Sequence, residues 1–312
     1  MMPPQESPQR KPHQHHVWQY YLRAWSVDGK VSFLQNHKID ATGTNVLGVK
    51  KNFYKIKSIT DEDVKLLHFL IALDNVHPVA RKHHEMVLQR ILTPTLFVQK
   101  HREKLNNLDL IDDYLDAYNT NVVDDYHTNI ESSFIPLLDR ARNEDFSWYD
   151  NDQECISFFN YLAAQQMRTR GVKERTITRL KERMDLDVSR IWDIMALIFG
   201  FNIGCSLFLE RKRRRLIVLH NKTAVSFITS DQPVVNLHAN GETPPESASL
   251  YYPISPRIAL YLPEPDKKSD IPLGTLTPDT ANFLNLRIAQ ASHSQVYAQS
   301  AESLLAFKDL IV

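Results

Sequence analysis

Helical periodicity runs through the chain from residue 61 to about residue 210, and this pattern most constrains the fold. The segment "TDEDVKLLHFLIAL" begins with Thr60, and an acid follows three residues later at Asp63, as in a helix-capping box. Apolar residues then recur at helical spacing. We predict helices over residues 61–74, 79–105, 107–142, 152–170 and 174–200, with proline, asparagine or glycine at their joins. The chain should therefore have a helical body.

From residue 213 onward the pattern changes to short apolar runs separated by turn residues. These runs are "RRLIVLH", "AVSFITS", "SLYYPIS" and "RIALYLP", and a helix "PDTANFLNLRIAQAS", a strand "QVYAQ" and a closing helix follow them. Near the N-terminus, residues 31–37 and 51–56 also have the composition of short strands. Because short strands are not stable alone, we expect the N-terminal and C-terminal strands to pair. The predicted fold class is α+β, a mainly helical body with a small antiparallel sheet built from both ends of the chain.

The domain organisation follows from the same patterns. Residues 1–12 are polar and rich in proline, and we predict a flexible arm there. Residues 13–312 are predicted to form a single interlocked α+β domain, helical over about 60–210 and rich in strands over about 213–300. Two separable domains are the alternative.

Composition excludes several classes of enzyme. The chain of 312 residues has 8 glycines, and it contains no GxGxxG, GxxxxGK or GxSxG string. Dinucleotide-binding folds, P-loop NTPases and hydrolases with a nucleophile elbow depend on such strings. Lysine plus arginine balances aspartate plus glutamate at 37 each, so attraction to nucleic acid would have to be local.

Several features favour a cytoplasmic protein. Cys155 and Cys205 lie in apolar runs, and two thiols provide neither a disulfide framework nor a four-thiolate zinc site. The polar N-terminus differs from secretory and lipidation signals. The apolar stretch at 191–209 is interrupted by Asp193, Asn202 and Ser206, so we predict a buried helix followed by an irregular segment, and no membrane span.

The first polar cluster lies in "KPHQHHVWQYYLRAW", residues 11–25. If the chain is helical from His16, then Gln19 and Arg23 share a face with His16, while Val17, Tyr21 and Trp25 pack behind. Such a stripe of polar side chains could bind a phosphate or a metal. A histidine-rich surface arm, or histidines that are hydrogen-bonded within the packing, would explain the same residues.

The second cluster lies in "FFNYLAAQQMRTRG". Gln165 falls on the apolar stripe of this predicted helix and should be buried, so its amide needs a polar partner. Arg168 reaches the same edge, and with Arg170 and Lys173 it could receive an anion where the helix ends. A basic helix end that complements its own dipole is the alternative.

Two further clusters carry oxygen and imidazole groups. The strand "SFITSDQPVV" runs into Thr229, Ser230 and Asp231, which are either ligands at a strand end or a turn that closes the strand. His127 and Glu131 are four residues apart on one predicted helix. That spacing permits a metal pair, an acid–base pair or a hydrogen bond on a solvated face.

Taken in order along the chain, these clusters resemble the bacterial family of uncharacterised proteins called domain of unknown function 4238. Its opening motif is similar to HHxxPQxYLRxF, and this chain has "HHVWQYYLRAW", with Trp18 at the proline position and Trp25 at the phenylalanine position. The QxxRT motif of the family resembles Gln165, Arg168 and Thr169, and its TSDxP motif resembles residues 229–233. The aromatic "NFY" at 52–54, Glu131 and "YPISP" at 252–256 also fit this order. In the opening motif, the matching residues are His15, His16, Gln19, Tyr21, Leu22 and Arg23.

The resemblance implies a shared polar site and a loose association with mobile or defence-type gene neighbourhoods, but no activity. Together with the residue types it favours a phosphodiester hydrolase, a nuclease of toxin or antiviral-defence type acting on RNA or DNA. His15 or His16 would be the general base or a metal ligand, and Arg23 and Arg168 would bind phosphate. The other expected roles are ligand or proton acceptor for Glu131 and Asp231, orientation for Gln19 and Gln165, and substrate binding for Thr169, Thr229 and Ser230.

Three questions stay open at this point. A divalent metal ion could be the cofactor, with His15, His16, Glu131 and Asp231 as its candidate ligands. The alternative function is a non-catalytic binding module for a phosphorylated ligand, a nucleotide or a partner protein, and the chain could also form a homo-oligomer. A third hypothesis is that the polar residues form a buried network that fixes the helical body against the sheet.

Overall fold

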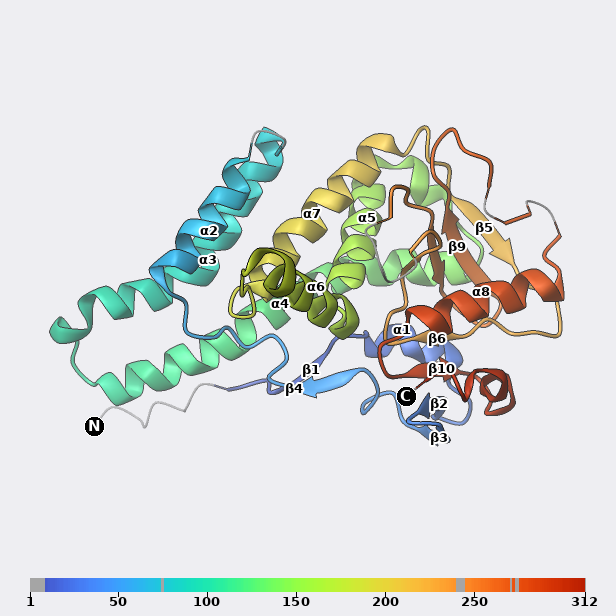
Figure 1. Cartoon of the computed structure of the whole chain (residues 1–312), viewed down its shortest axis with the longest axis horizontal. Helices are drawn as coiled ribbons and strands as arrows, with labels where there is room; N and C mark the ends of the chain where they lie inside the picture. Colours follow the sequence, from blue (N-terminus) through green and yellow to red (C-terminus); the bar gives the residue numbers. More distant parts are fainter. Residues whose placement is uncertain (1–8, 74–75, 240–244, 270, 273–274, 312) are drawn as a thin grey trace.

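The computed structural model describes residues 9–73, 76–239, 245–269, 271–272 and 275–311. A helical body occupies one side of the molecule, and small antiparallel sheets occupy the other (Figure 1). The α+β prediction is confirmed. The helices of the body are α2 (Asp61–Ala72), α3 (Pro78–His101), α4 (Leu108–Arg142), α5 (Asp152–Met167), α6 (Arg170–Met184) and α7 (Trp192–Glu210).

The start of α2 has the capping box that the sequence predicts. The backbone N–H of Asp63 donates to Oγ1 of Thr60 at 3.3 Å, and Oδ2 of Asp63 accepts from the backbone N–H of Thr60 at 2.9 Å. These bonds satisfy donors that have no partner within the helix.

The predicted helix over residues 174–200 is wrong as a single element. Helix α6 ends before Asp185, whose φ of 52° places it in the left-handed region, and α7 begins at Trp192. The irregular segment expected after this apolar helix is also wrong, because α7 continues to Glu210.

Close packing of α7 against α5 depends on small residues. A Cβ atom at Gly204 would lie 3.1 Å from the carbonyl oxygen of Phe159, and one at Gly200 would lie 3.5 Å from Cα of Ala164. Glycine therefore lets the two backbones approach. By length and composition α7 could cross a membrane, and half of its most apolar window is buried inside the protein.

Three antiparallel sheets complete the fold. Strands β1 (His13–His15) and β4 (Val49–Lys51) form a two-stranded ribbon. The second sheet has the order β3-β2-β10-β6, and the third has the order β5-β9-β8-β7. The strands of these two sheets are β2 (Val31–Gln35), β3 (Lys38–Thr42), β5 (Ile217–His220), β6 (Thr229–Ser230), β7 (Val235–Asn236), β8 (Leu250–Pro253), β9 (Ile258–Leu262) and β10 (Val296–Ala298).

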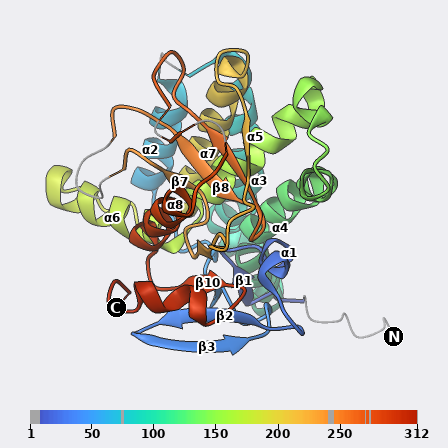
Figure 2. The same ribbon diagram turned by 90° about the vertical axis from the view of Figure 1, so that its right-hand side faces the viewer.

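The two ends of the chain pair as predicted. Val296 of β10 lies opposite Leu34 of β2 and also opposite Ser230 of β6. The blue N-terminal strands and the red C-terminal segment accordingly lie side by side in both views (Figures 1 and 2). The remaining elements are α1 (Gln19–Leu22), α8 (Pro278–Ala291) and the short 3-10 helices η1 (Arg23–Trp25), η2 (Arg102–Lys104), η3 (Ser147–Asp150) and η4 (Glu302–Phe307).

The N-terminal segment is anchored on both sides of the fold. Residues 9–12 lie along α4, where Nζ of Lys11 is 2.7 Å from Oδ1 of Asp125; residues 1–8 of the predicted flexible arm lie outside the described residues. Further on, Nε1 of Trp25 donates to the carbonyl oxygen of Phe227 at 2.9 Å. Val17, Tyr21 and Trp25 are fully buried, which confirms that the apolar side chains of this stretch pack behind it.

Candidate functional site

A pocket of about 350 Å³ lies where the N-terminal segment meets α4 and the end of α5. In Figure 2, β1 and α1 approach α4 in this region. Most of the lining side chains are polar, and they come from segments more than 100 residues apart. The described residues that line it are His13, His15, Trp18, Gln19, Tyr20, Arg23, Asp124, His127, Thr128, Glu131, Ile135 and Arg168.

One face of α4 supplies an acidic wall of the pocket. Asp124, His127, Glu131 and Ile135 follow one another at intervals of three or four residues, so their side chains share a face of the helix. The spacing of residues along the chain predicted the pair of His127 and Glu131, whereas Asp124 was not predicted. The spacing could have predicted it, because Asp124 is seven residues, or two helical turns, before Glu131 and therefore lies on the same face of the helix.

The pocket floor holds a buried ion pair. Nη1 of Arg168 lies 2.6 Å from Oε1 of Glu131, and the two side chains are 3% and 14% exposed. Burial raises the pKa of Glu131, while the guanidinium opposes that rise. The same ion pair strongly favours the charged form of Arg168 and raises its pKa further.

Gln165 connects this ion pair to the N-terminal motif. Its Oε1 atom accepts a hydrogen bond from Nε of Arg168 at 3.1 Å, and its Nε2 atom donates to the carbonyl oxygen of His16 at 3.0 Å. The side chain is 1% exposed, which confirms the predictions that Gln165 is buried and has polar partners. Gln165 thus holds Arg168 and the N-terminal segment in register.

His15 lines the pocket, and one of its two ring nitrogens has no hydrogen-bond partner among the described residues. Burial is the main cause that lowers the pKa of this imidazole, and Arg168 lowers it further. A hydrogen bond with the backbone of Asn45 favours the protonated form, whereas Nε2 is buried without a hydrogen-bond partner among the described residues. A neutral imidazole with one nitrogen fixed by the backbone and the other unpartnered can accept a proton.

His16 is placed differently from the prediction. The chain is not helical at His16, because β1 ends at His15 and α1 begins at Gln19. His16 is 6% exposed, its ring lies against Phe53 at 5.2 Å between centroids, and it is not among the described residues that line the pocket. Burial lowers its pKa to about 3, and the nearby charge of Arg168 contributes to the decrease, so the ring is neutral.

Asp124 is the second group poised for proton transfer. Burial raises its pKa to about 6, and the negative charge of Glu131 contributes to that rise. His127, one turn along α4, is buried with a pKa well below its ordinary value, again mainly because of burial. The pocket thus combines neutral imidazoles with a carboxyl that titrates near neutral pH.

Arg23 lies at the edge of the pocket. Its side chain is exposed, and its guanidinium carbon is 5.5 Å from the ring centroid of Tyr20. Gln19 donates from Nε2 to Oγ1 of Thr44 at 3.2 Å. Gln19 and Arg23 both line the pocket. The exposed guanidinium of Arg23 can meet a charged ligand that enters from solvent.

The remaining predicted residues lie away from the pocket lining. Oγ1 of Thr229 is 2.7 Å from the hydroxyl oxygen of Tyr21, the hydroxyl of Ser230 donates to the carbonyl oxygen of Gln232, and the hydroxyl of Thr169 donates to Oε1 of Gln232. These bonds close the turn and tie it to Tyr21 of α1 and to Thr169 at the start of α6. In the described part of the chain, the structure does not bring them into contact with the pocket.

Asp231 caps a turn of the C-terminal segment. Its carboxylate accepts hydrogen bonds from the backbone N–H groups of His293, Ser294 and Gln295 at 2.7 to 3.0 Å, and from the hydroxyl of Ser294. The residue is 1% exposed. Burial raises its pKa, although these hydrogen bonds oppose the rise.

The four candidate metal ligands do not converge. His15 and Glu131 line the pocket, whereas His16 packs behind it and Asp231 binds a distant turn. Among the residues that the structure describes, no three histidine, cysteine, aspartate or glutamate side chains are grouped closely enough to hold a metal ion.

Comparisons with known proteins give a family and no activity. No curated protein and no solved structure matches the chain. The family model described as a protein of unknown function (DUF4238) matches residues 13–302, which include the whole of the pocket. The chain therefore belongs to the DUF4238 family of proteins of unknown function.

Proposed function

We propose that this chain is a phosphodiester-cleaving enzyme, a nuclease of toxin or antiviral-defence type that acts on RNA in the cytoplasm. One observation carries the proposal. The neutral His15, with its unpartnered Nε2, shares a pocket with Asp124, whose pKa is about 6, and with Arg23 and Arg168. Phosphodiester cleavage needs a proton acceptor for the nucleophile, a proton donor for the leaving oxygen and cations that stabilise the charge on the phosphate.

The step follows from these roles. Nε2 of His15 accepts the proton of a ribose 2′-hydroxyl, and the 2′-oxygen forms a bond to the adjacent phosphorus. The bond from phosphorus to the 5′-oxygen breaks, and the leaving oxygen takes the proton of Asp124. The products are a 2′,3′-cyclic phosphate and a 5′-hydroxyl. Arg23 binds the phosphate at the edge of the pocket, and Arg168 offsets charge from below.

RNA is favoured over DNA because the 2′-hydroxyl supplies the nucleophile. With no grouped set of metal ligands in the described residues, a nucleophile that the substrate carries fits the side chains that are present. DNA lacks this hydroxyl, so we expect it to stay intact. The volume also fits, because pockets of roughly 300 to 1,000 Å³ hold small ligands and this pocket measures about 350 Å³.

The test is cleavage of total bacterial RNA and of plasmid DNA by the purified full chain, with EDTA or with Mg²⁺. His15→Gln and Asp124→Asn should each lower the rate of RNA cleavage about 100-fold or more. The matched controls are His68→Gln on the exposed face of α2 and Asp125→Asn beside Asp124, where the side chain is 40% exposed. Equal cleavage by all five proteins would refute the proposal.

The alternative is a binding module for a phosphorylated ligand, and the same experiment separates the two. Arg23 is exposed at the pocket edge and needs no proton transfer to bind phosphate. A module of this kind would bind RNA or a nucleotide saturably without turnover. Binding would then be lost in Arg23→Gln and retained in His15→Gln, and no cleaved RNA would appear with or without metal.

A further inference from the structure

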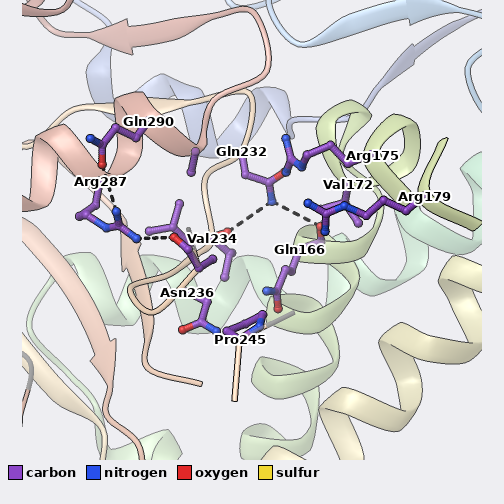
Figure 3. Close-up of a pocket in the computed structure, with 13 residues that line it drawn as sticks. Gln166, Val172, Arg175, Arg179, Gln232, Val234, Asn236, Pro245, Arg287 and Gln290 are labelled. Carbon is purple, nitrogen blue, oxygen red and sulfur yellow. Dashed lines mark hydrogen bonds between the residues drawn. The ribbon is translucent and has the colours of Figure 1, made fainter. Parts of the chain in front are cut away.

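A second and larger cavity, of about 640 Å³, lies between α6, α8 and the segment that follows β6. Helix α6 contributes Val172, Arg175 and Arg179, at spacings of three and four residues that place them on one face. Figure 3 shows Arg175 and Arg179 on one side of the cavity and Arg287 on the other. The described lining comprises Gln166, Val172, Arg175, Arg179, Gln232, Val234, Val235, Asn236, Ala239, Pro245, Arg287, Gln290 and Ala291.

The lining is strongly positive for a protein whose net charge is zero. It holds three arginines, and none of its described residues is acidic. Burial lowers the pKa of Arg175, and the neighbouring charge of Arg179 lowers it further. Like charges four residues apart on a helix repel each other, so an anion bound between them would stabilise this arrangement.

Arg287 and Arg175 are held in different ways. Arg287 donates to the carbonyl oxygens of Leu237 and Ala239 and, through Nη1, to Oε1 of Gln290. It therefore shapes the cavity wall and adds charge to it. The Nη1 atom of Arg175 occupies the space beside Gly171, where a Cβ atom would lie 2.8 Å away. Glycine at this position leaves room for the guanidinium.

The rest of the lining suits a flat heterocycle. Val172, Val234 and Val235 supply apolar surface, and Gln166, Asn236 and Gln290 supply amide donors and acceptors. Gln232 is fixed in the middle of the wall, since its Nε2 atom faces the carbonyl oxygens of Gln166 and Val234 (Figure 3). Arginines select phosphate, and apolar walls with a few amides select and orient a ring.

We propose that this cavity binds a nucleotide that carries two or more phosphates, with its phosphates between Arg175 and Arg179 and its base against the valine wall. Two arginine side chains match a polyphosphate better than a single phosphate group. The cavity volume lies in the range of small-ligand sites. This site is separate from the pocket around His15, because Gln166 lines it while the adjacent Gln165 faces Arg168.

The test measures binding by calorimetry with the full chain, using ATP, GTP, CTP and UTP, then the diphosphate and monophosphate of the best base, and inorganic pyrophosphate. At least one triphosphate should bind, its diphosphate should bind comparably, and its monophosphate should bind more weakly. Arg175→Gln and Arg179→Gln should each weaken binding by about tenfold or more. The control Arg183→Gln removes the same charge from an exposed position of α6 outside the lining and should leave binding unchanged.

Four results would overturn the proposal. They are absence of binding by all four triphosphates, equal weakening in the Arg183 control, equal affinity for inorganic pyrophosphate, and binding of RNA oligonucleotides alone. The third result would mean that the base makes no contact, and the fourth would identify a polynucleotide surface. Circular dichroism of each variant confirms that it is folded, so a loss of binding reports on the arginine itself.

Discussion

Arg168 and Glu131 form an ion pair beneath the pocket, with Nη1 and Oε1 2.6 Å apart and both side chains largely buried. Removing one member of a buried pair leaves the other charge uncompensated. We therefore expect Arg168→Met to lower the free energy of unfolding by about 3 to 5 kcal/mol, measured by urea denaturation. Arg170→Met breaks only the half-exposed pair with Glu174 and should cost about 1 kcal/mol or less. An unchanged urea midpoint in Arg168→Met would show that the pair contributes nothing.

Gln165→Ala should also destabilise the protein. The change leaves the carbonyl oxygen of His16 and the guanidinium of Arg168 without their partner, at a cost of about 1 to 3 kcal/mol. The control on the same helix is Gln153→Ala, an exposed position in the first turn of α5, with an expected change within about 0.5 kcal/mol. Equal urea midpoints for the two variants would contradict the bridging role of Gln165.

Asp231→Asn separates a structural role from a catalytic one. The change removes a carboxylate that accepts three backbone hydrogen bonds from residues 293–295, so we expect a loss of about 2 kcal/mol in stability. Because Asp231 does not line the pocket, the rate of RNA cleavage at a temperature where the variant is folded should equal that of the wild type. A 100-fold loss of rate there would show that Asp231 has the catalytic role that the sequence predicted.

Local signals in the sequence were sufficient where a residue and its partner are close along the chain. The capping box of Thr60 and Asp63 and the burial of Gln165 are of this kind. Polar residues in apolar runs were harder to interpret, because their partners are distant. Asn202 lies 2.8 Å from Nε2 of His84, and Asp193 binds Nζ of Lys173 at 2.8 Å. These pairings let α7 continue where its sequence alone indicated an interruption.

The candidate site was also only partly predictable from the sequence, for the same reason. Helical spacing could have included Asp124, but the placement of His16 and Asp231 depends on long-range geometry. β1 pairs with β4, 34 to 38 residues away, and this pairing keeps His16 out of a helix. Asp231 meets its turn across 62 to 64 residues. Neither contact leaves a periodic pattern in the sequence.

Because His16 is buried in its neutral form, we expect the free energy of unfolding to decrease at acidic pH. The pKa of His16 falls from 6.5 to about 3 on folding, so between these values the unfolded state binds more protons and stability decreases as the pH falls. For one such group the slope is about 1.4 kcal/mol per pH unit. His16→Leu should reduce the slope of unfolding free energy between pH 4 and 6 by roughly that amount. His68→Gln, at an exposed position, should keep the slope of the wild type.

Asp124 should affect the pH dependence of stability in the opposite direction to His16. Its pKa rises from 3.8 to about 6 on folding, so the folded state binds more protons in this window and stability falls as the pH rises through it. Above pH 6, Asp124→Asn should therefore be more stable than the wild type, by about 1 to 2 kcal/mol after solvent screening. Urea midpoints at pH 4 and pH 8 measure this difference.

The rate of RNA cleavage should depend on the same proton. As the general acid, Asp124 must be protonated, so the wild-type rate should fall as the pH rises above about 6, while protonation of His15 limits the rate at lower pH. In Asp124→Asn the residual rate should lose its decline above pH 6, because the amide does not titrate there. Asp125→Asn should retain the wild-type profile. A residual rate in Asp124→Asn that still declines above pH 6 would assign the acid to another group, since the only proton that the substitution removes is the one at position 124.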